Sequence, residues 1–367
     1  MIPIFTPYFK GNEARYLNDC IESGWISSQG GFVNKFQQDF AAFNKQKYGV
    51  ATSNCTTALH LALAAIKVGP GDEIICSALT FIAPANMIHL TGAKLILVDS
   101  DEPSWNMDPE KLREKITEKT KAIIVVHSFG HAARMDEIMS LANEFGLYVI
   151  EDVAEAPGAY YKDQMLGSIG HMSCYSFFGN KIMTTGEGGM VLTGDEVLKD
   201  KLEVLRDHGM SKQRPYVHTD LGFNYRMTNM QAAIGIAQLE ALPSILEKRM
   251  QQREEYQNLL SVPSLLGLRP CLDWCSPVHW LMTVTLQDET QRDRALEFLK
   301  NSGIDCRQMI YPVYHAHHFR DDFERKDFPI TEKISLKSLH LPSSTDLTSE
   351  QIQMISETLL DWLKRDG

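Results

Sequence analysis

The stretch Ser176-Phe-Phe-Gly-Asn-Lys181-Ile-Met-Thr-Thr-Gly-Glu-Gly-Gly-Met190 places a single lysine where an apolar strand gives way to a glycine-rich turn. Apolar side chains flank Lys181 on both sides. Such an environment favours the neutral form of an amine, which can form a Schiff base with a carbonyl group. The glycines Gly186, Gly188 and Gly189 allow the backbone to pass close to a bound group. The alternative interpretation is a lysine that ends a buried strand with its head in water.

The composition is typical of a soluble enzyme. The chain has 367 residues, 44% of them hydrophobic, so it can bury a large core, and its length favours two domains over one. The net charge of -11 comes without any basic block, which argues against nucleic acid as the main partner. Seven scattered cysteines lack the spacing of a zinc site or a disulfide scaffold, so we expect reduced thiols in the core. They are Cys20, Cys55, Cys76, Cys174, Cys271, Cys275 and Cys306.

The sequence carries no targeting or membrane signal that we recognise. The first residues, Met-Ile-Pro-Ile-Phe-Thr-Pro, contain no basic segment followed by an apolar one. No apolar run approaches the roughly 20 residues that a membrane-spanning helix needs. We therefore expect a cytoplasmic protein with no membrane partner.

Residues 47–195 alternate strand-like apolar runs with amphipathic helical stretches, which predicts an α/β fold with helices on both faces of a sheet. Seven strands joined by helices predict a mostly parallel sheet, and ligands bind such sheets at the carboxyl ends of the strands. The expected strands are Tyr48–Ala51, Glu73–Ser77, Lys94–Val98, Ala122–His127, Tyr148–Glu151, Ser173–Phe177 and Gly189–Thr193. The expected helices include Thr57–Ala65, Pro84–Leu90, Pro109–Ile116 and Met135–Glu144.

The rest of the chain predicts a second, smaller α+β domain. Helical patterns cover Asp195–Asp207 and Thr228–Leu260, and we expect Pro243 to kink the second of these helices. The pattern then predicts a strand at Val278–Leu286, a helix at Gln291–Ser302, a short strand near Ile304–Met309 and a closing helix at Ser349–Lys364. We place the large domain at residues 1–245 and the small domain at residues 246–367.

Small polar residues lie where predicted strands end. Thr56 and Thr57 open a helix directly after a strand, where free backbone amides and the helix dipole bind phosphate and the two hydroxyls add donors. A simple helix N-cap uses the same residue types and is the alternative interpretation. Ser176, at the end of another strand, is a further candidate donor to a phosphate group.

Asp152 follows an apolar strand and is expected to be buried. A buried carboxylate needs a cation or donors, so we expect a partner such as a protonated pyridine nitrogen, a pairing that keeps the ring an electron sink. The alternative is a carboxylate that caps the next turn. Phe81, at another strand-to-helix junction, can stack on a planar ring, although an aromatic residue is more often plain core. With Lys181, these residues supply the parts that an aldehyde-bearing phosphate cofactor needs.

Four motifs together resemble the DegT/StrS family of nucleotide-sugar aminotransferases over nearly the whole chain. They are the Lys181 stretch quoted above, Asn224-Tyr-Arg-Met-Thr-Asn229, Glu151-Asp152-x-Ala-Glu155 and Ser23-Gly-Trp-Ile-Ser-Ser28. The resemblance implies the aspartate aminotransferase fold (fold type I) with a large and a small domain. It also implies the cofactor pyridoxal 5'-phosphate, with pyridoxamine phosphate (PMP) as the intermediate form, and a homodimer with shared active sites.

The resemblance also implies a role for each matching residue. Lys181 would bind the cofactor covalently and move a proton between the amino donor and the cofactor. Asp152 would pair with the pyridine nitrogen, and Glu155 would lie near the phenolic oxygen. Phe81 would stack on the ring. The phosphate contacts would come from Thr56, Thr57 and Ser176, and from Asn224 of the partner subunit.

The chain departs from the family's usual wording in two places. Many members read Ser-Gly-Thr at the phosphate turn, whereas this chain has Asn54-Cys55-Thr56, so the backbone at Cys55 has either an ordinary φ or some strain. Members often read Pro-x-His in a loop of the small domain, where this chain has Tyr314 followed by His315. This change puts the family's sugar contacts in doubt, and Tyr314 and His315 are our candidates for them.

An anionic nucleotide needs nearby cations, and the candidates are Arg226, Lys212 and Arg214. For Lys212 and Arg214, a solvated surface loop is a nearly equal alternative. The histidines His315, His317 and His318 have no carboxylates or cysteines at ligand spacing, so we expect polar loop residues and no metal.

These observations favour transfer of an amino group from L-glutamate to a keto carbon of a nucleotide-linked deoxysugar. The motif wording favours a GDP-linked 4-keto-6-deoxymannose, and UDP- or dTDP-linked 3- or 4-ketosugars are the alternative. Family members that dehydrate such sugars typically carry histidine where this chain has Lys181, so dehydration is disfavoured. A non-catalytic regulator is a third hypothesis, which the retained Lys181, Asp152 and Glu155 make improbable.

Overall fold

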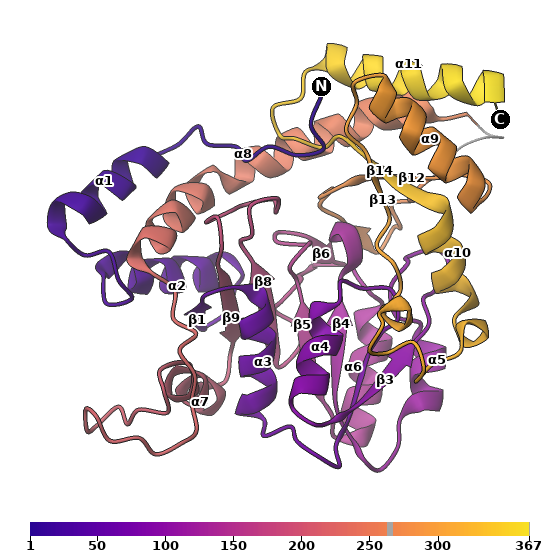
Figure 1. The fold of residues 1–367 in the computed structure, drawn as a ribbon. Coiled ribbons are helices and arrows are strands. Elements are labelled where there is room, and N and C mark those ends of the chain that lie inside the picture. The colour runs from indigo at the N-terminus through magenta and orange to yellow at the C-terminus, as the bar shows by residue number, and fades with distance from the viewer. Residues whose placement is uncertain (263–266, 367) are drawn as a thin grey trace.

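A seven-stranded sheet forms the centre of the larger part of the protein. The computed structural model describes residues 1–262 and 267–366. The strands of this sheet are β1 (Tyr48–Thr52), β2 (Glu73–Ser77), β3 (Lys94–Val98), β4 (Thr120–Val126), β5 (Tyr148–Asp152), β8 (Met172–Ser176) and β9 (Gly189–Thr193). Their order is β1-β9-β8-β5-β4-β2-β3, and β9 alone among them runs antiparallel to its neighbours (Figure 1). The predicted mostly parallel sheet of seven strands is confirmed.

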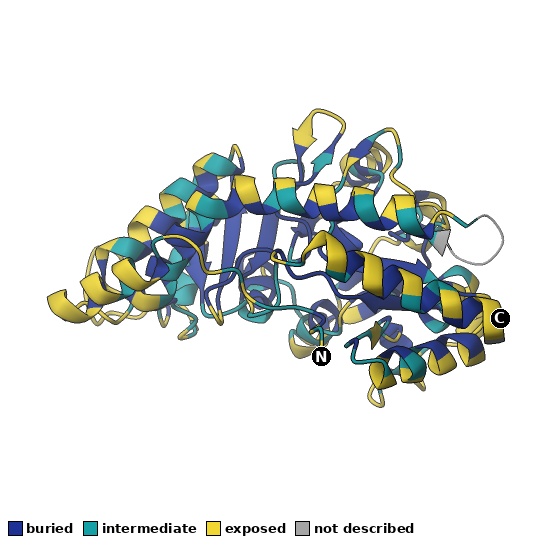
Figure 2. Ribbon diagram, turned by 90° about the horizontal axis from the view of Figure 1, so that it is seen from above, coloured by how far each residue is buried: buried dark blue, intermediate teal, exposed yellow. Residues whose placement is uncertain are grey.

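Helices cover both faces of this sheet because alternate residues of the buried strands point to opposite sides. One face packs on α2 (Gly31–Phe43), α6 (Met135–Phe145) and α8 (Asn229–Leu260). The other face packs on α3 (Cys55–Ala65), α4 (Ala83–Leu90) and α7 (Glu196–Arg206). Two further helices are α1 (Glu13–Ser23), which lies along α8, and α5 (Pro109–Lys115), which lies near α6. Figure 2 shows the buried strands between helices whose outer sides are exposed.

The smaller part is an α+β unit, as predicted, built on a sheet with the order β10-β12-β14-β13. Its strands are β10 (Gly267–Leu268), β12 (Met282–Thr285), β13 (Arg307–Gln308) and β14 (Ser338–Leu341), and its helices are α9 (Glu289–Asn301), α10 (Pro329–Lys337) and α11 (Ser349–Asp366). The chain's first residues join this unit: Ile2 N–H donates to Gly303 O (2.8 Å), and Ser343 N–H donates to Ile4 O (2.8 Å). The N-terminal segment, which we expected in the large domain, therefore lies against the small one.

Helix α8 connects the two parts. Its N-terminus is closed by a capping box between Thr228 and Gln231, and the helix runs on through Pro243 without interruption. A proline inside a helix costs about 3 kcal/mol. Here the early residue Ile236 is buried in the large core, and Tyr256 near the end is buried in the small core, so packing at both ends offsets that cost. Because α8 crosses residue 245, the domain boundary at that residue stays a prediction.

Several elements were not predicted. These are α1, α2, α10, β10, β14, a small sheet made of β6 (Tyr160–Tyr161), β7 (Gln164–Met165) and β11 (Cys275–Ser276), and the 3-10 turns η1 (Ser128–Gly130), η2 (Val313–His315) and η3 (Arg325–Asp327). The predicted strand Val278–Leu286 is wrong in its first half. Val278 N–H donates across to Gly130 O (3.0 Å), so this segment leaves the small sheet and lies against the large part.

Two further expectations concern the burial of the cysteines and the absence of a membrane-spanning helix. All seven thiols are free, but Cys271 is exposed and Cys306 is half-buried, so the prediction that all lie in the core is wrong for these two. Among the helices that the structure describes, none has the length and apolar character that a bilayer would require.

Candidate active site

The predicted cofactor residues Lys181, Asp152, Ser176 and Thr56 lie at one edge of the large sheet. Strands β1, β5 and β8 run parallel, and their ends lie side by side through the pairs Thr52–Gly189, Asp152–Cys174 and Ser176–Gly189. The loop from β8 to β9 carries Lys181 over this edge, and α3 begins there.

Hydrogen bonds within the β8–β9 loop fix the backbone around Lys181. Phe177 N–H donates to Gly188 O (2.9 Å), and Thr185 N–H donates to Phe177 O (2.8 Å). Gly186 has a φ of 81°, in the left-handed region that favours glycine. A Cβ on Gly189 would lie 2.5 Å from the backbone of Asn54, so glycine lets this loop approach the start of α3. Gly189 thus allows a close approach to the protein's own backbone, and the predicted approach of these glycines to a bound group stays a prediction.

The amine of Lys181 lies between a carboxylate and an aromatic ring. Its Nζ is 3.6 Å from Glu155 Oε1 and 3.7 Å from the centroid of the Trp280 ring, and the side chain is only 12% exposed. The structure therefore contradicts the alternative in which the head lies in water. Of its predicted apolar neighbours, Phe177, Ile182 and Met183 are buried, whereas Phe178 is 47% exposed.

Trp280 is a site residue that the sequence did not reveal. Its Nε1–H donates to Asn180 O (2.7 Å), so a hydrogen bond holds the indole against the backbone next to Lys181. The ring of Phe129 lies parallel to it, with 6.3 Å between the centroids. No local pattern marks Trp280, because it reaches Lys181 only through the crossing of the segment that we expected to be a strand.

Glu155 is held in place by the backbone of an unusual residue. Phe129 N–H donates to Glu155 Oε2 (2.6 Å), which leaves Oε1 facing Lys181. Phe129 has a φ of 52°, and a bulky residue in this region is strained unless its surroundings hold it there. The packed ring and the bond to Glu155 supply that restraint.

Asp152 is a buried carboxylate with few partners. Its Oδ1 accepts one bond, from Ala154 N–H (3.0 Å), and among the residues described no cation forms an ion pair with it. Burial raises its pKa to about 6, with the charge of Glu155 adding to the shift. The neighbouring Glu151, in contrast, accepts bonds from His127 and three backbone amides. A carboxylate left in this state fits a ligand that brings a positive charge, such as a protonated pyridine nitrogen.

The start of α3 shows how the predicted phosphate turn is built. Asn54 Oδ1 accepts from Thr57 N–H (2.9 Å), and the Thr57 hydroxyl donates back to Asn54 O (2.8 Å). Thr57 therefore has the capping role of the alternative interpretation. The amides of Cys55 and Thr56, at the first two positions of the helix, stay available for an anion. Cys55 has an ordinary φ, so replacing the family's glycine causes no strain there.

The other cofactor candidates lie at the same edge. Ser176 ends β8 and is almost buried, and its hydroxyl lies 3.4 Å from Phe178 N. Phe81 lies between β2 and α4 and is 60% exposed, so it is not plain core, and its ring face can receive a planar group. Asn224 is exposed, and its Oδ1 accepts from Arg226 Nε (3.0 Å). Its predicted contact with a second subunit stays a prediction.

The predicted nucleotide cations are partly used within the chain. Arg226 pairs with Asp207 (3.0 Å), and Lys212 pairs with Asp200 (2.6 Å) and Glu203. Both line a cavity beside α7 and the start of α2, and Lys181 is not among its lining residues. Arg214 is exposed in the same loop.

Tyr314 and His315 are both used inside the chain. Tyr314 is 2% exposed, because η2 packs under α4, and its hydroxyl donates to Glu332 Oε2 (2.7 Å). Burial and this bond raise the pKa of Tyr314. His315 Nε2 lies 3.1 Å from the same oxygen. The predicted sugar contacts of Tyr314 and His315 stay predictions, and Tyr311, which is 48% exposed and stacked on His315, presents its ring at the surface.

Changing Trp280 should alter catalysis more than substrate binding. Trp280→Phe keeps a ring face under Lys181 but loses the bond to Asn180, and we expect kcat to fall about 3-fold. Trp280→Leu loses both, and a loss of about 1–2 kcal/mol of cation–π energy predicts a fall of about 5- to 30-fold. Steady-state kinetics should show KM for the amino donor nearly unchanged. An unchanged kcat in the leucine variant would contradict a positioning role.

Known proteins of the same architecture match the whole chain. It is 39% identical to the GDP-perosamine synthase of Escherichia coli O157:H7 over 358 residues, which cover 98% of this chain and 97% of that protein. It is 41% identical to the GDP-perosamine synthase of Caulobacter vibrioides over 365 residues, with coverage of 98% and 97%. Its structure superposes on Spr1654 of Streptococcus pneumoniae in the PLP-form with a TM-score of 0.94 at 25% identity, over 99% of each chain.

The cofactor follows from the site and from these matches. Lys181 offers an amine, and Asp152 offers a buried carboxylate that forms no ion pair among the described residues. The start of α3 offers free backbone amides. Together these groups fit pyridoxal 5'-phosphate. The model of the DegT/DnrJ/EryC1/StrS aminotransferase family matches residues 7–360. The chain belongs to this family of pyridoxal 5'-phosphate-dependent aminotransferases.

Proposed function

We propose that the protein transfers the amino group of L-glutamate to the keto carbon of GDP-4-keto-6-deoxymannose and so forms GDP-perosamine. The product would enter bacterial surface polysaccharide, such as lipopolysaccharide O-antigen. The observation that carries this proposal is the full-length similarity to two GDP-perosamine synthases, at 39% and 41% identity. A lysine at position 181, enclosed by Glu155 and Trp280, supports amino transfer over dehydration.

Each residue of the site has a task in this reaction. When bound, pyridoxal 5'-phosphate supplies the electron sink that allows a proton to leave the α-carbon of an amino acid. Lys181 Nζ would carry that proton, since its amine lies at this edge of the sheet, 3.6 Å from Glu155 Oε1. Asp152 would hold the pyridine nitrogen, and the amides of Cys55 and Thr56 would hold the phosphate. Glu155 and Trp280 keep the free amine of Lys181 in place while it carries the proton.

We also propose a homodimer in the cytoplasm, with Asn224 and the loop from His208 to Arg226 completing the partner's site. The exposed position of Asn224 and the exposed Tyr216 and Leu221 of this loop support a subunit contact. Mixing Asn224→Ala with Lys181→Ala subunits should restore some activity if the sites are shared. No recovery in such mixtures, or a monomer in solution, would contradict the shared site.

The substrate is tested by a panel of GDP-, UDP- and dTDP-linked ketosugars with L-glutamate as donor. We expect kcat/KM for the GDP-linked 4-ketosugar to exceed the others by about 100-fold or more, because a missing hydrogen-bonding group leaves buried partners unpaired. Equal or better use of a UDP- or dTDP-linked sugar would overturn the sugar assignment. That result would not contradict amino transfer itself. Amino transfer is tested separately by adding L-glutamate, which should remove the absorbance band of the bound cofactor.

A further inference from the structure

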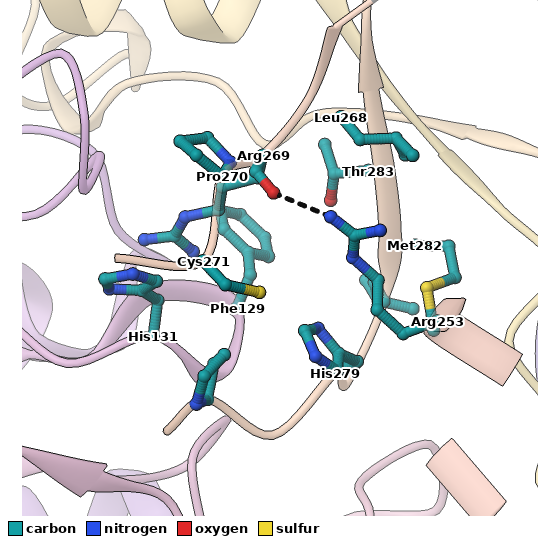
Figure 3. Close-up of a pocket in the computed structure, with 12 residues that line it drawn as sticks. Phe129, His131, Arg253, Leu268, Arg269, Pro270, Cys271, His279, Met282 and Thr283 are labelled. Atoms are coloured by element: carbon teal, nitrogen blue, oxygen red, sulfur yellow. Dashed lines mark hydrogen bonds between the residues drawn. The ribbon is translucent and has the colours of Figure 1, made fainter. Parts of the chain in front are cut away.

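A cavity next to the active site is lined by cations and by no acid. It lies between the loop after β4, helix α8 and the segment from Leu268 to Thr283 (Figure 3). Two arginines line it, Arg253 from α8 and Arg269 from the segment after β10, and Arg249 lies one turn before Arg253 on the same helix. No aspartate or glutamate is among the lining residues.

Arg249 and Arg253 are buried and Arg269 is half-buried, and the carboxylates near them act only at a distance: Asp346 on Arg249, and Glu155 and Asp101 on Arg269. Arg249 is 0% exposed and Arg253 is 9% exposed, and burial lowers the pKa of Arg249 to about 9 and that of Arg269 to about 10. Over residues 1–262 and 267–366, no carboxylate forms an ion pair with any of the three. Residues 263–266 carry no acidic side chain. Buried cations that lack a partner destabilise a fold by several kcal/mol each.

The hydrogen bonds of these arginines go only to neutral groups. Arg249 Nη1 donates to Trp280 O (3.1 Å), and Arg253 Nη2 donates to Arg269 O (3.0 Å), the bond drawn in Figure 3. Arg269 donates to the carbonyl oxygens of Ser104 and Ser128. Some donor atoms have no hydrogen-bond acceptor, namely Arg249 Nε and Nη2 and Arg269 Nε, although the guanidinium group of Arg249 lies over the Phe5 ring and that of Arg269 over the Trp105 ring. Such donors are usually satisfied in a folded protein, so a further acceptor is missing.

Two histidines that line the cavity have lowered pKa values, in part because of the positive charge of the arginines. His131 and His279 line the cavity, and the pKa of each is lowered to about 3, first by burial and then by the charge of the arginines. For His279 the arginines are all three of the cluster, Arg253, Arg269 and Arg249. The histidines are therefore neutral at pH 7 and add no further positive charge to the cavity.

We propose that this cavity binds one small anion, of the size of chloride or of a single carboxylate group. Its volume is about 20 Å³, just above the roughly 10–15 Å³ that one water molecule needs, which suits an anion of this size. The anion supplies the missing acceptor and the missing negative charge. Its two sources are a free ion and the carboxylate of the amino donor, and the second rests on the proposed function.

The anion would also steady the reacting lysine. Phe129 is a wall of the cavity, and its backbone holds Glu155. Arg249 holds the carbonyl of Trp280, whose ring lies under Lys181. An anion that fixes the arginines therefore fixes both contacts of the Lys181 amine.

The test is the melting temperature of the holoenzyme as chloride replaces methanesulfonate, a larger monovalent anion, at constant ionic strength. We expect a saturable rise of about 3 °C. Arg253→Met and, independently, Arg269→Met should abolish the response, whereas Arg320→Met, which removes an exposed arginine (57% exposed), should keep it. No response in the unmodified protein, or an undiminished one in whichever cavity variant folds, overturns the site.

Steady-state kinetics distinguish a free ion in the cavity from the carboxylate of the amino donor. If the donor's carboxylate enters the cavity, chloride and the amine-free dicarboxylate glutarate should both raise KM for L-glutamate about 3- to 10-fold without changing kcat. If chloride raises the melting temperature but leaves this KM unchanged, the site holds a free ion. Failure of the protein to use L-glutamate would overturn the proposed function and leave the melting test intact.

Discussion

Replacing Lys181 by alanine should lower kcat by at least about 10⁴-fold, because the variant loses both the covalent attachment and the proton carrier. Borohydride reduction should fix the cofactor covalently to the unmodified chain and not to the variant. Mass spectrometry should show the added mass on the unmodified chain alone. Added methylamine should restore part of the rate, since a small amine can occupy the space of the missing side chain between Glu155 and Trp280.

Lys181→Arg is the matched control for this experiment. Arginine keeps a positive charge between Glu155 and Trp280, but it is not deprotonated at any relevant pH, so it neither bonds to a carbonyl carbon nor accepts a proton. We expect it to be as inactive as the alanine variant while melting closer to the unmodified protein. A rate near normal in either variant would remove Lys181 from the chemistry, and a rate retained in Lys181→Arg alone would reduce its role to that of a charge.

The parts of the site that could be predicted are those carried by local sequence. Lys181, Asp152 and Thr56 each follow a recognisable strand, and parallel strands end at one edge of a sheet. The pattern of seven apolar runs was therefore enough to bring these residues together, although they are more than 100 residues apart at the extremes. The alternatives at Thr57 and Cys55 needed atomic detail, because a capping box and a phosphate turn use the same residue types.

The parts that could not be predicted depend on contacts between distant segments. Trp280 reaches Lys181 because residues 278–280 cross to the loop after β4, and an apolar run does not state which sheet it will join. The helical pattern of residues 228–260 does not show that Arg249 and Arg253 are buried. The surroundings of Tyr314 and Lys212 also depend on such contacts, because the sequence does not show that Tyr314 bonds to Glu332 or that Lys212 pairs with Asp200.

Asp152→Asn should stabilise the cofactor-free protein at pH 7 and weaken cofactor binding. A carboxyl group whose pKa is raised in the folded state, here to about 6 from 3.8, stabilises the folded chain fully below pH 3.8, and this contribution is lost as the pH rises through about 6. At pH 7 the difference is about 3 kcal/mol against the folded state. Asparagine is neutral and can still accept the bond from Ala154, so the cofactor-free variant should lose this dependence between pH 4 and 7.

With cofactor bound, Asp152→Asn should destabilise the protein at pH 7 instead of stabilising it. The pyridine nitrogen loses its charged partner, so we expect cofactor affinity to fall about 100-fold and kcat to fall further, because the ring is then a weaker electron sink. Thermal melts of the cofactor-free and cofactor-bound forms across this pH range, with a cofactor titration, measure both effects.

Glu151→Gln, at the adjacent position, separates this functional carboxylate from a structural one. Burial alone would raise the pKa of Glu151, but the bonds from His127 and the amides of Gly167 and Gly170 outweigh it, and the pKa is lowered. A glutamine would turn an NH₂ group toward these donors, so we expect a loss of about 1–3 kcal/mol with or without cofactor. If Asp152→Asn behaved in the same way and lowered the stability of the cofactor-free protein, Asp152 would be a structural acid, and the pyridine nitrogen would need another partner.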